Sequence, residues 1–193
     1  MITVNYLEAL KQHGIDFASI KAVIISEVPP QNLDDDFYSM AVMPDYVKST
    51  VGLFREAGVN ANNIRDILDM GIYITTAVKS PKTSYTVDSD VIKLHLPILE
   101  EELVAFPNLQ AIFLAGDVAK KAVNIIVKAR TKKNVIPSGS TCRIRHKEFY
   151  WGDIRVFPSY IITGKNLLIE KGKCIMIAED IRRMMDYIKR GFV

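Results

Sequence analysis

Four short, mostly apolar runs constrain the fold of this chain more than any other feature. They are rich in β-branched and small residues, and a proline or a glycine follows each of them within a few positions. Runs that are apolar without regular alternation are typical of strands whose two faces are both covered, as in a parallel sheet. The sequence therefore predicts buried strands at 22–26, 71–78, 111–115 and 153–157.

Helical patterns separate these strands. The segments 45–57, 89–106, 118–129 and 178–190 place apolar residues three and four positions apart. Pro97 lies inside the second of them and predicts either a kink or two short helices there. Strands that alternate with helices indicate an α/β fold. We therefore predict one domain over residues 1–193, a three-layer α/β/α sandwich with a four-stranded, mainly parallel sheet.

Composition excludes several other classes of protein. Hydrophobic residues make up 49% of the chain and charged residues 24%, which is ordinary for a globular domain and unlike disordered or collagen-like chains. No apolar run reaches the roughly 18 residues that a membrane span needs. The first residues lack the basic and apolar regions of a secretory signal. The two cysteines, Cys142 and Cys174, are too few for a disulfide framework. These features predict a cytoplasmic protein with no membrane partner.

Positive charge is concentrated in one tract. Residues 120–147 contain nine Lys or Arg and no acid. The whole chain carries a net charge of +3, so subtracting these nine charges leaves −6 on the remaining residues. Such an asymmetry indicates either a surface that attracts a polyanion or a solvated helix face and loop. For a nucleic-acid partner, the candidate contacts in this tract are Lys132, Lys133, Arg143 and Arg145.

Polar residues stand at the end of each predicted strand. In open α/β sheets, ligands bind beyond the carboxyl ends of the strands. The segments at these ends are 26–32, 75–81, 116–117 and 158–160, and their charged side chains include Glu27, Lys79 and Asp117. None of the segments contains the phosphate loops GxxxxGK[ST] or GxGxxG, which argues against a nucleoside triphosphatase or a dinucleotide-dependent enzyme.

The residues at these strand ends resemble those of one known superfamily. IISEVPPQN is similar to the G-E-A-P-G loop of uracil-DNA glycosylases, and GIYITTAVKSP to the second strand of their iron–sulfur type, Y-I-T-N-A-V-K-C-x-P. AIFLAGDVAKKAV resembles the third strand with its helix start, and VFPSYIITGKN resembles the H-P-S-Y-L-L loop. The resemblance covers about residues 20–185 and keeps the order of the motifs. It implies a uracil-DNA glycosylase-like fold.

The resemblance also implies a DNA-repair task and a set of site residues. Enzymes of this kind turn a base out of DNA into a pocket before they hydrolyse its N-glycosidic bond. Carried over to this chain, the catalytic positions are Glu27, Thr76 and Ser159. The loop beside the pocket contains Ser26, Val28, Pro29, Pro30 and Gln31, the base-stacking residue is Phe37 or Tyr38, and the DNA-gripping loop contains Pro158, Ser159 and Tyr160.

Three side chains at the implied site depart from the family pattern. Val28 stands where archetypal members carry a water-activating Asp, Thr76 where they carry the Asn that reads uracil, and Phe157 where they carry His. Valine cannot orient water, one hydroxyl cannot replace the paired contacts of an amide, and phenylalanine cannot stabilise charge on a base oxygen. The usual catalytic arrangement of the family is therefore not expected in this chain.

The metal cluster of the iron–sulfur type is not expected either. Ser80 and His95 stand at two of its four cysteine positions, and the sequence has no N-terminal Cys-x-x-Cys. The two cysteines of this chain cannot supply four thiolates. We predict no iron–sulfur cluster, no other metal site and no cofactor.

Three functional hypotheses remain open. The first is a divergent DNA N-glycosylase that hydrolyses the bond to uracil or another damaged base. The second is a catalytically inactive protein that retains the fold and binds a nucleic acid or a nucleobase. The third is a hydrolase or transferase of free nucleosides. Glu27 is accordingly either an acid–base catalyst or a structural group that accepts hydrogen bonds from loop amides.

Overall fold

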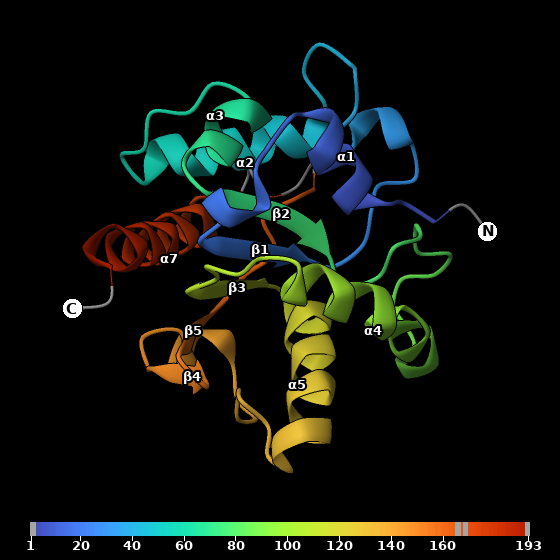
Figure 1. Ribbon diagram of the computed structural model, residues 1–193, viewed down its shortest axis with the longest axis vertical. Helices are drawn as coiled ribbons and strands as arrows, with labels where there is room; N and C mark the ends of the chain where they lie inside the picture. Colours follow the sequence, from blue (N-terminus) through green and yellow to red (C-terminus); the bar gives the residue numbers. More distant parts are fainter. Residues whose placement is uncertain (1–2, 165–166, 168–169, 192–193) are drawn as a thin grey trace.

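A five-stranded sheet forms the centre of the fold (Figure 1). The computed structural model describes residues 3–164, 167 and 170–191. The strands are β1 (Ala22–Ser26), β2 (Ile72–Thr76), β3 (Ala111–Ala115), β4 (Phe149–Trp151) and β5 (Ile154–Ser159). They lie in the order β2-β1-β3-β5-β4, in which only β4 is antiparallel to its neighbour. The predicted α/β class and the mainly parallel sheet are confirmed.

The sheet has five strands, so the predicted number of four is wrong. The additional strand, β4, is three residues long and joins β5 through a turn at Gly152, whose φ is +59°. Its side chains are exposed or half-buried, because β4 is an edge strand. Its three aromatic residues are shorter than the runs of about four to eight residues by which strands are predicted, and the sequence pattern therefore did not reveal the strand.

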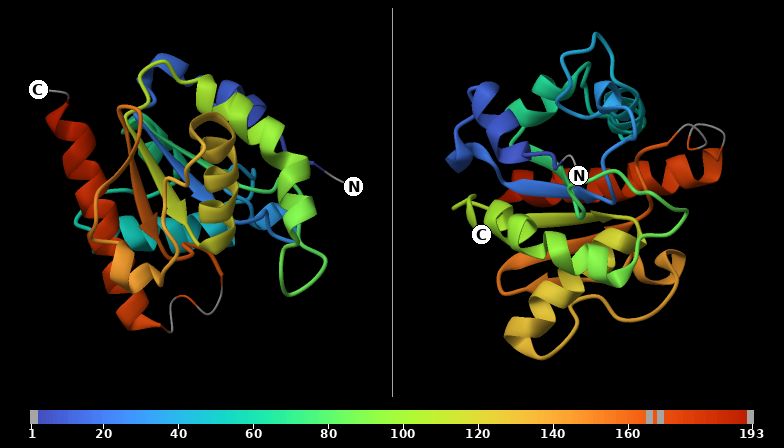
Figure 2. Two further views of the ribbon diagram at one scale, coloured as in Figure 1. Left: turned by 90° about the horizontal axis from the view of Figure 1, so that it is seen from below. Right: turned by 90° about the vertical axis from the view of Figure 1, so that its right-hand side faces the viewer.

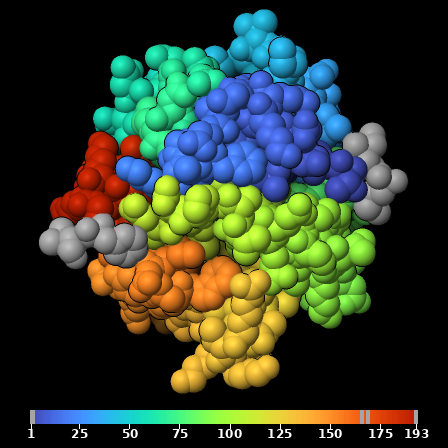
Figure 3. All heavy atoms as spheres, viewed as in Figure 1, coloured from blue at the N-terminus to red at the C-terminus, as the bar shows by residue number. Residues whose placement is uncertain are grey.

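Helices cover both faces of the sheet. They are α1 (Tyr6–Gln12), α2 (Asp45–Glu56), α3 (Ile64–Asp69), α4 (Ser89–Val104), α5 (Asp117–Thr131), α6 (Thr141–Ile144) and α7 (Lys171–Arg190). The buried residues of α1, α4 and α5 form a core on one face, and those of α2 and α7 form a core on the other (Figure 2). This arrangement matches the predicted three layers. The C-terminal end of α5 projects from the body of the molecule (gold in Figure 3).

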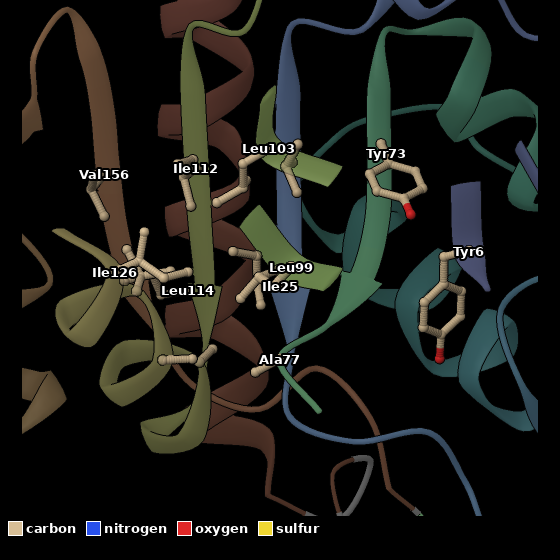
Figure 4. Packing of buried hydrophobic residues seen from close by; sticks show 14 of the residues in the cluster. Tyr6, Ile25, Tyr73, Ala77, Leu99, Leu103, Ile112, Leu114, Ile126 and Val156 are labelled. Atoms are coloured by element: carbon tan, nitrogen blue, oxygen red, sulfur yellow. The ribbon is translucent and has the colours of Figure 1, made fainter. Parts of the chain in front are cut away.

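The strands β1, β2 and β3 are buried on both faces, as the apolar runs predicted. Figure 4 shows one of the two layers, in which Ile25, Ile112 and Leu114 of neighbouring strands share a cluster with Leu99 and Leu103 of α4. Full burial of such a side chain contributes about 1.5–3 kcal/mol relative to exposure. The well-packed core therefore fixes the positions of the residues at the strand ends.

Two helical predictions need correction. α4 is one helix with Pro97 inside it, so the alternative of two short helices is wrong. α7 begins at Lys171, well before the predicted start at 178, because Cys174 and Ile177 continue its packed face. Within the described residues, no helix combines the length and the apolar character that crossing a membrane requires.

Candidate functional site

A pocket of about 810 Å³ opens at the carboxyl ends of β1, β3 and β5. These three strands are neighbours and run in the same direction, so the residues that follow them meet at one edge of the sheet. Glu27 follows β1, Gly116 and Asp117 follow β3, and Ser159 and Tyr160 stand at the end of β5. The segment 139–141 and described residues between 161 and 173 complete the wall. We call this hollow the strand-end pocket.

Glu27 lies against the start of helix α5. The backbone N–H of Val118 donates a hydrogen bond to Glu27 Oε1 at 3.2 Å. Gly116 permits this approach, since its φ is +111° and a Cβ added there would overlap Oε1 and lie 2.8 Å from Ile161 Cγ1. The positive end of a helix dipole favours a carboxylate at this position. The glycine that follows β3 thus fixes where the carboxyl group of Glu27 lies.

The environment of Glu27 favours proton exchange. Burial raises the pKa of its carboxyl group, the N–H of Val118 partly lowers that pKa, and the nearby charge of Asp117 raises it. A carboxyl group with a raised pKa in a pocket is a candidate acid–base catalyst. Both interpretations of Glu27 from the sequence, an acid–base group and an acceptor of amide hydrogen bonds, therefore fit its geometry.

Ser159 is hydrogen-bonded to helix α7, which lies behind the pocket. Its Oγ donates a hydrogen bond to Asp180 Oδ2 of α7 at 2.7 Å, and Arg145 Nε donates to the same oxygen at 3.1 Å. Burial raises the pKa of Asp180, while the bonds from Ser159 and Arg145 lower it. Ser159 is 0% exposed, so its hydroxyl is not accessible to a substrate and suits positioning of the strand end rather than nucleophilic attack. No sequence signal indicated Asp180, which lies on the packed face of α7.

The predicted stacking residues do not line the strand-end pocket: Phe37 lies in the core and Tyr38 is half-buried against it. Phe37 is 0% exposed and packs on the ring of Tyr46, with 5.2 Å between the ring centroids. Tyr38 donates its hydroxyl proton to Ile74 O at 2.8 Å, and burial raises the pKa of that hydroxyl. The sequence located these rings only by their position along the loop, whereas apolar burial decides where they lie.

Thr76, the predicted reader of the base, is also outside the strand-end pocket. It ends β2, which is the edge strand beyond β1. Its side chain is fully buried and donates its hydroxyl proton to Val78 O at 2.6 Å. The structure therefore does not bring Thr76 together with Glu27 and Ser159.

The predicted pocket loop divides between two hollows. Glu27 lines the strand-end pocket, whereas Pro30 and Gln31 line a neighbouring hollow of about 630 Å³. Gly164 lines both, so the two hollows adjoin. The remaining residues of the loop, Ser26, Val28 and Pro29, are buried. None of the five residues predicted for the pocket loop therefore lines the strand-end pocket, to which this segment contributes Glu27 alone.

The four basic residues predicted to contact nucleic acid differ in exposure. Lys132, Lys133 and Arg143 are exposed. Arg145 is only 4% exposed, and its guanidinium group pairs with Asp180 and, at 2.7 Å, with Glu179 Oε2. Arg145 is accordingly engaged in an internal ion pair that joins the end of α6 to α7, and it offers no free charge at the surface.

The predicted DNA-gripping loop begins inside a strand. Pro158 and Ser159 belong to β5, where they pair with Leu114 and Ala115 of β3, and both are buried. Tyr160 is the first residue beyond β5, is half-buried and lines the strand-end pocket. Of the three, Tyr160 therefore offers the most exposed side chain to a ligand.

The end of β2 holds a buried charged cluster that the sequence analysis did not predict. Lys79, expected at the rim of a site, is fully buried, and its Nζ lies 2.7 Å from both Glu102 Oε2 of α4 and Thr75 Oγ1. Burial lowers the pKa of Lys79 and raises the pKa of Glu102, and the charge of each residue offsets part of the shift of the other. Lys79 is therefore a structural residue.

In the same region, Ser80 Oγ lies 3.3 Å from His95 Nε2.

The comparisons with known protein families and curated proteins found no match for this chain. In the part of the chain that the structure describes, no three His, Cys, Asp or Glu side chains gather into a group that could hold a metal ion. The strand-end pocket and Glu27 are the features that a functional proposal can use.

Proposed function

We propose that this chain is a uracil-DNA glycosylase-like enzyme, which takes uracil or another damaged base of DNA into the strand-end pocket and hydrolyses its N-glycosidic bond. The observation that carries the proposal is the carboxyl group of Glu27, which lines that pocket and has a raised pKa. The pocket volume of about 810 Å³ falls within the range of small-ligand sites, roughly 300–1,000 Å³. A base with its sugar fits this range.

Glu27 is the acid–base group in this scheme. The bond between the anomeric carbon and the base nitrogen breaks, and the departing base takes the electron pair. A water molecule attacks the anomeric carbon from the opposite face and gives a proton to Glu27, which returns that proton to solvent, while the departing base takes a proton from solvent. The raised pKa helps, because a group whose pKa lies closer to neutrality both accepts and returns a proton readily.

The contact between Ser80 and His95 supports the resemblance on which the proposal also rests. These residues stand at two cysteine positions of the iron–sulfur type. Positions that bind one metal cluster must lie close together, and Ser80 Oγ is 3.3 Å from His95 Nε2. A polar pair thus stands where the resemblance expects two thiolates, which supports the alignment of the motifs with this fold.

A catalytically inactive protein that binds a nucleic acid or a nucleobase is the second candidate. The observation that favours it is the absence of the side chains that read and polarise uracil in the family. Thr76 is buried with its hydroxyl bonded to Val78 O, and Phe157 is buried in the core. A protein of this kind would bind its ligand without releasing a base.

Base release separates the two candidates. DNA oligonucleotides that contain uracil, hypoxanthine, xanthine or an alkylated base are incubated with the protein, and the abasic sites are cleaved and quantified. The proposal predicts base release by the wild type and a rate at least about 100-fold lower in Glu27→Gln. Glu101→Gln is the control, since Glu101 is exposed on α4 outside the strand-end pocket, and it is expected to keep the wild-type rate.

Each alternative outcome has a distinct meaning. No release from any substrate, with binding of oligonucleotides retained, supports the inactive binding protein and overturns the enzyme. Equal rates in Glu27→Gln and Glu101→Gln contradict the role of Glu27. Turnover of free nucleosides without release from oligonucleotides supports a nucleoside hydrolase or transferase in place of a DNA glycosylase.

A further inference from the structure

A third hollow adjoins the strand-end pocket along helix α5. Its volume is about 380 Å³, and it lies between α5 and the segment 134–139. We call it the lysine groove, because Lys120, Lys121 and Lys128 of α5 line it. Asp117 and Gly139 line both the lysine groove and the strand-end pocket. A flexible chain that enters the pocket can therefore continue directly into the groove.

The outer wall of the lysine groove is fixed by Asn124. Its Nδ2 donates a hydrogen bond to Ile136 O at 2.8 Å, and the Ile136 N–H donates to Asn124 Oδ1 at 2.9 Å. The side chain of Ile136 is buried in the core. These contacts hold the segment 134–139 beside α5, so the groove is formed before any ligand arrives. A preformed groove lowers the entropic cost of ordering the protein on binding.

Two of the three lysines keep their charge available to a ligand. Lys120 is paired with Asp117, with 2.5 Å between Nζ and Oδ1. Among the described residues, Lys121 contacts only the neutral hydroxyl of Ser89, and Lys128 is exposed without an acidic partner. Lys121 and Lys128 are seven residues apart, which puts them on one side of the helix and about 10.5 Å apart along its axis.

We propose that the lysine groove binds the phosphodiester backbone of the DNA strand whose base enters the strand-end pocket; this inference rests on the proposed function. Ammonium groups without acidic partners attract phosphates, and a positively charged groove that follows the backbone is typical of proteins that bind single strands. One helix and one loop segment bound the groove, so it accommodates one strand. Lys132 and Lys133 lie just beyond the groove, where α5 projects from the molecule (Figure 3), and extend the positive charge along the same path.

Salt-dependent binding tests this inference without relying on catalysis. A fluorescent single-stranded oligonucleotide is titrated with the wild type, with Lys121→Ala/Lys128→Ala and with the control Lys189→Ala/Arg190→Ala, over a range of NaCl concentrations. The control removes the same charge from the last turn of α7, where Lys189 lines a hollow with Lys21 at the opposite ends of the strands.

The expected result is a change in salt dependence. Each phosphate contact on a single strand contributes about 0.7 to the slope of log affinity against log salt concentration. The slope is expected to fall by about 1.4 in Lys121→Ala/Lys128→Ala and to stay unchanged in the control. Both lysines are exposed, so the variant is expected to keep the melting temperature of the wild type, which thermal unfolding checks.

Two results would overturn the inference. One is a wild-type slope in Lys121→Ala/Lys128→Ala. The other is binding of a free 5′-mononucleotide as tightly as the oligonucleotide, because the groove would then hold one phosphate and not a strand. If the wild type releases the base but Lys121→Ala/Lys128→Ala keeps the wild-type salt slope, the proposed role of the groove is wrong and the proposed hydrolysis stands. If the slope falls in that variant but the wild type releases no base, the groove binds the strand and the proposed hydrolysis is wrong.

Discussion

Two parts of one sheet edge use their charged residues in opposite ways. After β1, Glu27 lies against the start of α5 and lines an open pocket. After β2, Lys79 is fully buried between Glu102 and Thr75. Each residue follows a buried strand by one to three positions, so the two are alike in the sequence. The difference arises because α4 covers the end of β2 with a buried carboxylate, whereas the ends of β1, β3 and β5 stay open.

A polar side chain that follows a strand can contact a ligand only where no helix buries it. Charges that leave water cost several kcal/mol each, and their pairing recovers this cost only with good geometry. The pair of Lys79 and Glu102 therefore belongs to the stability of the fold. Glu27 lines the strand-end pocket and is available for chemistry on a bound ligand. Mutations at the two strand ends test this difference.

The largest effect is expected at the buried pair. Glu102→Leu leaves the Lys79 ammonium group without its partner, and such a loss lowers the free energy of unfolding by about 3–5 kcal/mol. Lys79→Met/Glu102→Leu is expected to lose less than Glu102→Leu, since no charge then remains buried. Urea titration of the three proteins measures these differences. Unfolding of Glu102→Leu at the wild-type urea concentration would show that the pair does not hold the end of β2.

A smaller effect on stability, coupled to an effect on activity, is expected at Gly116. Gly116→Ala forces a side chain into a conformation with φ of +111° and against Glu27 Oε1. Backbone strain of this kind costs about 1–3 kcal/mol, and displacement of Glu27 slows base release.

The matched control for Gly116 is Gly52→Ala in α2, where an added Cβ meets nothing within 4 Å. Replacing glycine inside a helix by alanine stabilises a protein by about 0.4–1 kcal/mol. Unfolding titrations and the base-release assay on both variants check the comparison. An equally active Gly116→Ala would mean that the close approach of Glu27 to α5 is not needed for the reaction.

The sheet and Glu27 were predictable because they depend on local pattern and on one general rule. Apolar runs without alternation identify buried parallel strands, and parallel strands direct their following residues to one edge. The same rule included Glu27, Asp117 and Tyr160 in the candidate site, and all three line the strand-end pocket. The edge strand β4 was missed because its three residues are too few for a recognisable apolar run.

The remaining features depend on packing between distant segments. Phe37 is drawn into the core by contacts with α2, and Arg145 is neutralised by Asp180, a residue 35 positions away. The exposure of a loop aromatic or of an arginine is not encoded in its neighbours along the chain. A basic tract in the sequence therefore did not distinguish the buried Arg145 from the exposed Lys128.

The smallest effect is expected from the titration of Glu27. Its pKa in the folded protein is raised above the ordinary 4.5, so the folded protein binds this proton more tightly than the unfolded chain does. The stability that this adds is present below the ordinary pKa and is lost as pH rises through the raised one. Glu27→Gln lacks the titration, so its stability relative to the wild type is expected to rise over that window. Urea titrations at a series of pH values measure the difference, and parallel pH profiles of the two proteins would contradict a raised pKa.

A crystal structure of Glu27→Gln with a uracil-containing oligonucleotide would locate the bound base. The account predicts the extruded base in the strand-end pocket, next to position 27, with the backbone of the same strand beside Lys121 and Lys128. A base held at the end of β2 near Thr76, or an oligonucleotide bound elsewhere while the strand-end pocket holds no base, would contradict it.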